Sequence, residues 1–262
     1  MNEPARDRLE PFRTFKTAGK PIVVLTAYDY PTARLLEEAG VDSLLVGDSL
    51  GMVVLGYRDT VSVTMEEMIH HVRAVARGRT HANVIGDLPY ASYETPEQAL
   101  ANARRLVEAG ADAVKLEGGR EVAACVRAIA GEGIPVVGHI GMLPQHVREE
   151  GGYKIKGRTD EEGRRLAEDA LALEEAGAIA IVLELVTPQV SGEIRRRLRI
   201  PTIGIGSGAD CDGQVLVIHD LIGLFPWFTP KFATPVAQVG VTIRETAATF
   251  AGRVRADTPP LA

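Results

Sequence analysis

A glycine that ends a helix just before a short apolar strand occurs three times in this chain, and this repeat constrains the fold more than any other feature. The three segments span residues 36–46, 107–116 and 174–183. Glycine adopts the left-handed conformation that ends a helix without steric cost. The apolar run that follows is typical of a strand buried on both faces. Three such units indicate a parallel sheet covered by helices.

The same alternation extends along the rest of the chain. Eight strands are expected at 22–28, 43–47, 82–86, 113–117, 135–139, 179–185, 201–205 and 214–218. Helices are expected near 31–39, 65–77, 96–109, 120–131, 160–176, 188–198 and 235–252. Eight parallel strands joined by helical crossovers predict an α/β protein, a closed (β/α)8 TIM barrel. An open doubly wound sheet is the alternative.

Length and composition agree with one barrel. The 262 residues give about 33 per strand–helix unit, close to the size of one such repeat. We therefore expect a single domain over 1–262, with 1–19 as an N-terminal extension or helix and 253–262 as a flexible tail. Hydrophobic residues make up 45% of the chain, enough for a sizeable core.

Charge and cysteine usage exclude several classes of partner and location. The chain has 29 basic and 35 acidic residues, a net charge of −6, which argues against nucleic acid or an anionic membrane surface as a partner. No apolar run approaches the roughly 18 residues that a membrane span needs. The two cysteines lack metal-binding spacing and are typical of free thiols in a reducing compartment. A cytoplasmic location is expected.

Ionisable residues stand at the ends of five successive expected strands. In chain order these residues are Asp48, Asp87, Lys115, Glu117, His139 and Glu184. The carboxyl ends of barrel strands meet at one mouth, where active sites of this fold lie. A charged group in an apolar strand is costly unless it is paired, hydrogen-bonded or bound to a metal. Any one of these residues could simply be ion-paired at the rim, but their convergence favours a functional site.

The acidic members of this set have the chemistry of a site for a hard cation. Asp48, Asp87 and Glu117 supply oxygen ligands of the kind that Mg²⁺ prefers. Zinc fits less well, because no cysteine and only one histidine, His139, accompany them. Lys115 and Glu117 are two residues apart on a strand, so their side chains are expected on the same face.

Several ordered motifs resemble the ketopantoate hydroxymethyltransferase family. They are Thr26-Ala27-Tyr28-Asp29, Val46-Gly47-Asp48-Ser49-Leu50-Gly51-Met52-Val53, Asp87-Leu88-Pro89 with Ser92-Tyr93, Lys115-Leu116-Glu117-Gly118-Gly119, Gly138-His139-Ile140-Gly141, Gly151-Gly152-Tyr153-Lys154 with Gly157-Arg158, and Gly204-Ile205-Gly206-Ser207-Gly208 with Cys211-Asp212-Gly213-Gln214. The resemblance runs in order from about residue 10 to 233. It implies a Mg²⁺-dependent barrel enzyme of pantothenate biosynthesis, typically a homodecamer. Such enzymes transfer a hydroxymethyl group from 5,10-methylenetetrahydrofolate to 3-methyl-2-oxobutanoate, giving 2-dehydropantoate.

The resemblance also implies roles for individual residues. Asp48 and Asp87 are expected to bind Mg²⁺ directly, and Glu117 to complete the metal site through water. Asp48, Ser49, Asp87 and Lys115 are expected to contact the oxo acid. Glu184 is expected to be the catalytic base. For His139, a hydrogen bond beside the reacting groups and a purely structural role both stay open.

Two other functions are compatible with the same residues. One is a 2-oxo-acid lyase or mutase of the phosphoenolpyruvate–isocitrate lyase superfamily, which shares the barrel and a strand-end Gly-Asp-Ser. The other is a non-catalytic barrel.

The chain also departs from the family pattern at two places. Tyr57 stands where a histidine is expected, and the stretch after Phe232 differs from the usual continuation.

Overall fold

Eight parallel strands form a closed barrel in the computed structural model, which describes residues 7–228 and 230–256. Each strand pairs with the next one along the chain. The strands are β1 (Ile22–Thr26), β2 (Ser43–Val46), β3 (Asn83–Asp87), β4 (Ala113–Glu117), β5 (Val136–Gly141), β6 (Ala180–Glu184), β7 (Thr202–Ile205) and β8 (Gly213–Leu216). The predicted TIM barrel is confirmed, and the open sheet is excluded.

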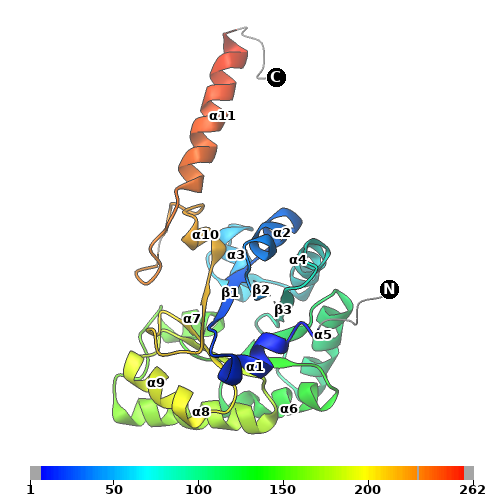
Figure 1. Cartoon of the computed structure of the whole chain (residues 1–262), viewed down its shortest axis with the longest axis vertical. Helices are drawn as coiled ribbons and strands as arrows, with labels where there is room; N and C mark the ends of the chain where they lie inside the picture. The colour runs from blue at the N-terminus through cyan, green and yellow to red at the C-terminus, as the bar shows by residue number, and fades with distance from the viewer. Residues whose placement is uncertain (1–6, 229, 257–262) are drawn as a thin grey trace. The chain divides into compact units, whose positions relative to one another are not determined.

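Helices connect the first seven strands and lie outside them (Figure 1). The connecting helices are α2 (Tyr30–Glu38), α4 (Met65–Gly78), α5 (Pro96–Glu108), α6 (Ala123–Gly131), α8 (Asp160–Ala176) and α9 (Pro188–Arg197). Shorter turns follow several strands, namely α3 (Leu50–Val53), η1 (Thr60–Ser62), η2 (Arg120–Val122), η3 (Pro144–His146) and α7 (Val147–Glu150). The link from β7 to β8 contains no helix within the described residues. No helix in this part of the chain has the length and apolar character to cross a membrane.

The repeated helix-to-strand junction is built as the sequence predicts. Gly40, Gly110 and Gly177 follow helices α2, α5 and α8, and their φ angles are +85°, +111° and +105°. Each junction continues into a strand whose residues are all buried, namely β2, β4 and β6. The glycine therefore turns the chain from the outer layer back into the barrel.

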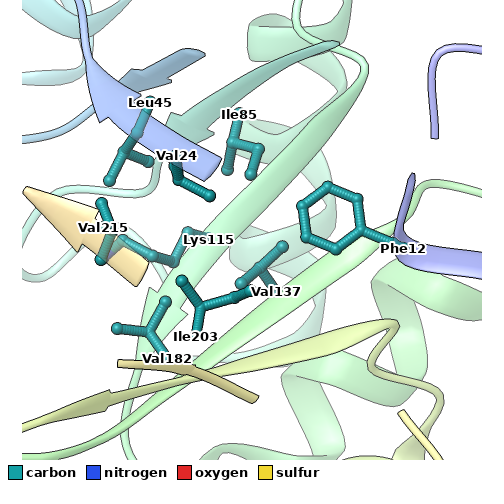
Figure 2. Close-up of a pocket in the computed structure, with 9 residues that line it drawn as sticks. All are labelled: Phe12, Val24, Leu45, Ile85, Lys115, Val137, Val182, Ile203 and Val215. Carbon is teal, nitrogen blue, oxygen red and sulfur yellow. The ribbon is translucent and has the colours of Figure 1, made fainter. Parts of the chain in front are cut away.

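The N-terminal helix α1 (Glu10–Ala18) packs at the end of the barrel where the strands begin. Asn83, the first residue of β3, donates from Nδ2 to the Arg8 carbonyl oxygen at 3.1 Å. Phe12 is buried and faces aliphatic side chains of the strands across a void of about 10 Å³ (Figure 2). The lining residues are Phe12, Val24, Leu45, Ile85, Lys115, Val137, Val182, Ile203 and Val215. The barrel interior is thus a packed apolar core at this end.

The structure refines three of the expected boundaries. The segment 120–131 divides into η2 and α6, and the helix expected at 235–252 is α11 (Val239–Arg255). Arg253 to Arg255 belong to α11, so the expected tail does not begin at 253. The remainder of that tail, 257–262, and residues 1–6 of the expected N-terminal extension lie outside the described residues.

The chain forms two compact units, one ending at Val215 and the other beginning at Leu216. The second unit contains α10 (Ile218–Leu221) and α11. Within it, the amide groups of Val236 and Val239 donate to the carbonyl oxygens of Leu221 and Ile222 at 2.8 and 3.0 Å. The single domain expected over 1–262 stays a prediction.

Closure of the barrel depends on Gly213, because a Cβ atom there would collide with the Ile22 carbonyl oxygen and would lie 2.8 Å from Ile203 Cδ1. We predict that Gly213→Ala lowers the free energy of unfolding by about 1–3 kcal/mol, the usual cost of overpacking. Gly131→Ala is the matched control, since a Cβ there has no neighbour within 4 Å and alanine favours the helix by up to about 1 kcal/mol. Urea unfolding measures the free energy of unfolding of each variant. Equal values for Gly213→Ala and Gly131→Ala would contradict the prediction.

Candidate active site

Strand register brings the predicted residues side by side. Asp87 of β3 is level with Lys115 of β4, and Glu117 of β4 is level with His139 of β5. One strand further, Glu184 of β6 is level with the end of β5. With Asp48, which follows β2, these side chains form the strand-end cluster: Asp48, Asp87, Lys115, Glu117, His139 and Glu184. All six residues are buried.

The cluster contains short contacts between its charged and polar groups, and Lys115 pairs with the carboxylate of Asp87. Asp87 Oδ2 lies 3.1 Å from Lys115 Nζ and accepts the backbone N–H of Asp48 at 3.1 Å. On the other side of Lys115, His139 Nδ1 lies 3.3 Å from Nζ. The expectation that Lys115 and Glu117 share a face is confirmed, because both contact His139.

His139 links two carboxylates on different strands. Its Nδ1 is 3.4 Å from Glu117 Oε1, and its Nε2 is 3.2 Å from Glu184 Oε2. The Nε2 contact is close enough for an ion pair but is not aligned as a hydrogen bond. The imidazole therefore lies between the carboxylates of Glu117 and Glu184, close enough to form an ion pair with each when it is protonated.

The cations of the cluster keep their protons. Burial opposes the charge of Lys115, but the surrounding carboxylates, Asp87 foremost, outweigh it and hold the pKa of the ammonium above its ordinary value. Burial and Lys115 also act to lower the pKa of His139, yet Glu117 and Glu184 raise it to about 9. With His139 protonated, Nδ1 donates toward Glu117 and cannot accept from Lys115.

The acids respond differently to the same burial. Burial, reinforced by the charges of Asp87 and Glu117, raises the pKa of Asp48 well above its usual range. Burial also raises the pKa of Asp87, although Lys115 opposes it. Burial acts to raise the pKa of Glu117, but His139, Lys115 and the Gln145 backbone N–H together lower it below its ordinary value. The two aspartates are thus the acids that most need a compensating positive charge.

The residues of the cluster fit a divalent cation. When ionised, its four carboxylates outnumber its two cations, Lys115 and His139, by two charges. Asp87 Oδ1 is buried and makes no hydrogen bond. Among the described residues, no three His, Cys, Asp or Glu side chains form a ready-made metal cage. Mg²⁺ does not require one, since it is commonly held by one or two carboxylates while substrate and water complete its coordination.

Ser49 lies next to the cluster with its hydroxyl fixed by a neighbour. Its Oγ is 2.8 Å from the hydroxyl of Tyr28, a buried residue that follows β1. His71, on α4, contacts the Tyr28 carbonyl oxygen through Nδ1 at 2.6 Å. The structure therefore places every site residue predicted from the sequence at the same end of the barrel, and their roles stay predictions.

Sequence reasoning missed Gln145 and the part played by Tyr93. Gln145, in η3, donates from Nε2 to Asp48 Oδ2 at 2.7 Å, and its backbone N–H donates to Glu117 Oε2 at 3.0 Å. The Tyr93 hydroxyl hydrogen bonds to Gln145 Oε1. A lone amide side chain in a loop has neither periodicity nor charge to mark it, so no sequence signal identified Gln145.

The comparisons with known proteins agree with this geometry. The sequence profile of the ketopantoate hydroxymethyltransferase family matches residues 6–261. The chain belongs to this family. The prediction of a hydroxymethyltransferase is thereby confirmed at the level of the family, and the non-catalytic barrel is not supported.

Relatives named 3-methyl-2-oxobutanoate hydroxymethyltransferase match over nearly their full length. The one from Ignicoccus hospitalis is 56% identical over 238 residues, covering 90% of each chain. The one from Thermus thermophilus is 52% identical over 251 residues, covering 95% of each chain. The one from Acetivibrio thermocellus is 52% identical over 246 residues, covering 93% of this chain and 87% of the relative.

Solved structures with the same fold are more distant in sequence. Phosphonopyruvate hydrolase is 14% identical, with a TM-score of 0.65 over 96% of this chain and 88% of that one. A 2,3-dimethylmalate lyase, titled a member of the PEP mutase/isocitrate lyase superfamily, is 17% identical, with a TM-score of 0.64 over 97% of this chain and 90% of that one. These proteins share the barrel, and at such identity the likeness concerns the fold alone. The alternative lyase or mutase function has no further support.

Proposed function

We propose that this chain transfers a hydroxymethyl group from 5,10-methylenetetrahydrofolate to 3-methyl-2-oxobutanoate, forming 2-dehydropantoate for pantothenate synthesis. The observation that carries the proposal is the buried strand-end cluster, with its four carboxylates and two basic groups, in a chain of this family. The reaction consumes one water and releases tetrahydrofolate. It breaks the C–H bond beside the oxo group of the acid and forms a C–C bond there.

Asp48 and Asp87 would hold one Mg²⁺ per chain, and Glu117 would support it through a water molecule. The support is the hard oxygen character of these side chains, the raised pKa values of the two aspartates and the unpartnered Asp87 Oδ1. When bound, Mg²⁺ supplies a Lewis acid that stabilises negative charge on the oxygens of the oxo acid.

Glu184 would remove the proton from the branched carbon of the oxo acid. It stands at the end of β6 with 11% of its side chain exposed, so it is shielded from bulk water but remains accessible to a bound ligand. His139 keeps its own proton and so does not compete as the base. Its Nε2 instead lies 3.2 Å from Glu184 Oε2, so the positive charge of the imidazolium attracts this carboxylate.

Lys115 would stabilise the enolate that remains after proton removal. Its charge is maintained by the surrounding carboxylates despite its burial. A fixed positive charge in a site shielded from water acts strongly on developing negative charge. Ser49, whose hydroxyl is held by Tyr28, would hydrogen bond to the oxo acid beside the two aspartates and Lys115.

Self-association is supported by α11, which contains no buried residue. Ile243, Phe250 and Val254 are 54%, 53% and 52% exposed and recur at intervals of seven and four residues along one face. Such an apolar face on a helix is typical of a helix that packs against another surface. We infer a homo-oligomer, a decamer as in the family, whose small-molecule partners are the oxo acid and the folate.

The free thiols of Cys125 and Cys211 support a cytoplasmic location.

The activity assay tests the proposal directly. Purified protein with MgCl2, 3-methyl-2-oxobutanoate and 5,10-methylenetetrahydrofolate should form 2-dehydropantoate, measured by mass spectrometry. EDTA should abolish the reaction, because it removes the cation that the carboxylates require, and excess MgCl2 should restore it. Absence of product with Mg²⁺ present would refute the assignment, and full activity in EDTA would refute the metal site.

Glu184→Gln tests the base. We expect this variant to bind the oxo acid but to lose exchange of its C3 proton with D2O by about 100-fold or more, the usual contribution of a general base. Proton NMR measures the exchange. Glu193→Gln, on the exposed side of α9, is the matched control and should exchange at the parent rate. If Glu184→Gln also exchanges at that rate, another group is the base.

Sedimentation velocity tests the oligomer. The parent protein should sediment as an assembly of ten 28.1 kDa chains. Phe250→Asp should shift it to smaller species, because a charge on the apolar face of α11 opposes its burial. Thr242→Asp changes an exposed polar position of the same helix and should leave the assembly intact. A monomeric parent protein would overturn the inference.

A further inference from the structure

Gln145 has a buried amide side chain and contacts two carboxylates of the cluster, those of Asp48 and Glu117. It lies in η3, after β5, and is 1% exposed. Glutamine is rarely buried so completely unless its hydrogen-bonding groups are paired. The partners that pair with its amide therefore show whether Gln145 serves the packing of the core or the site.

The hydrogen bonds of Gln145 fix the direction of its amide. Nε2 donates to Asp48 Oδ2 at 2.7 Å and to the Leu88 carbonyl oxygen at 2.9 Å. A carbonyl oxygen can only accept, so the nitrogen side must face Leu88 and Asp48. On the other side, Oε1 accepts from the Tyr93 hydroxyl. Burial raises the pKa of that hydroxyl, which keeps it a donor.

The backbone of Gln145 holds a second carboxylate of the same cluster. Its N–H donates to Glu117 Oε2 at 3.0 Å. One residue thus fixes one oxygen of Asp48 and one of Glu117, while Lys115 and the Asp48 N–H fix Asp87 Oδ2. The opposite oxygen of Asp87, Oδ1, has no partner and is buried.

The chemical type of the donor matters as much as its position. An amide orients a carboxylate by hydrogen bonding but adds no net charge, so the excess negative charge that attracts a divalent cation is preserved. A lysine or arginine at this position would bind Asp48 more strongly and would cancel part of that charge. Gln145 is suited to orienting metal ligands and not to neutralising them.

We propose that Gln145 is a positioning residue that presents Asp48 and Glu117 to Mg²⁺, and that Tyr93 acts through it by fixing the amide. This inference rests on the magnesium site of the proposed function. Loss of partners that orient metal ligands commonly weakens metal binding by about 10- to 100-fold, and the same range is expected here.

Calorimetric titration of MgCl2 into metal-free protein tests the proposal. Gln145→Met keeps the length and burial of the side chain but removes the amide, and it should raise the Kd for Mg²⁺ by about 10- to 100-fold. At saturating MgCl2 its kcat should return to within a few-fold of the parent value. Gln189→Met is the matched control, because Gln189 is an exposed residue of α9 and does not belong to the cluster. It should leave the Kd unchanged.

Tyr93→Phe provides a second variant in case Gln145→Met folds poorly. It should weaken Mg²⁺ binding by a smaller factor, and the double variant Tyr93→Phe/Gln145→Met should bind no more weakly than Gln145→Met alone. Such non-additivity is the mark of residues that act through one another. Thermal unfolding in EDTA separates a loss of stability from a loss of metal affinity.

The outcomes separate this inference from the proposed function. A parent protein that binds no Mg²⁺ would overturn the metal site and this inference together. A parent protein that binds Mg²⁺, with a Kd unchanged in Gln145→Met, would overturn only the role of Gln145. Additive effects of the two substitutions would overturn the role of Tyr93.

Discussion

Four carboxylates and two cations shielded from water at the ends of the strands are the arrangement on which the rest of this molecule depends. An isolated charge in such a place costs several kcal/mol or more, and only close opposite charges and hydrogen bonds offset that cost. Here the opposite charges lie 3.1 to 3.4 Å apart on neighbouring strands. A slip of one residue in β4 would turn both Lys115 and Glu117 away from the barrel interior. The strand register is therefore as essential to the site as the residues themselves.

The rest of the barrel creates the surroundings that these charges need. Beyond Lys115 toward the start of the strands, the interior is lined by aliphatic side chains, with Phe12 at the far side (Figure 2). An apolar, closely packed floor excludes water and strengthens every electrostatic contact above it. Burial raises the pKa values of Asp48 and Asp87, so a cation bound beside them would stabilise the site.

The fold was predictable from local pattern to a large extent. The strand expected at 113–117 is the observed β4, and most other strand boundaries differ by one or two residues. This accuracy follows from strong local signals, since a helix that ends at glycine and a strand buried on both faces leave little freedom. The segment after 235 was predicted less well, because the residues of α11 are exposed and no burial pattern marks its ends.

The site was predictable only in part, for a related reason. A charged residue in an apolar strand is conspicuous, so Asp87, Lys115, Glu117 and Glu184 were identified together with the mouth they share. Gln145 was not identified, because an amide in a loop carries neither charge nor periodicity. Its hydrogen bond to Asp48 joins residues 97 positions apart, and no local pattern encodes such a contact.

The sequence by itself predicted the alternation of strands and helices along the chain and the strand ends at which the ionisable residues gather, and its comparison with known sequences identified the family. Only the tertiary structure decided which charges pair, that His139 stands between Glu117 and Glu184, and that Gln145 joins Asp48 to Glu117. The physical reason is the range of the interactions. Strand and helix signals act over a few neighbouring residues, whereas proton affinities and hydrogen bonds depend on distances of 3 to 4 Å between segments far apart in the chain.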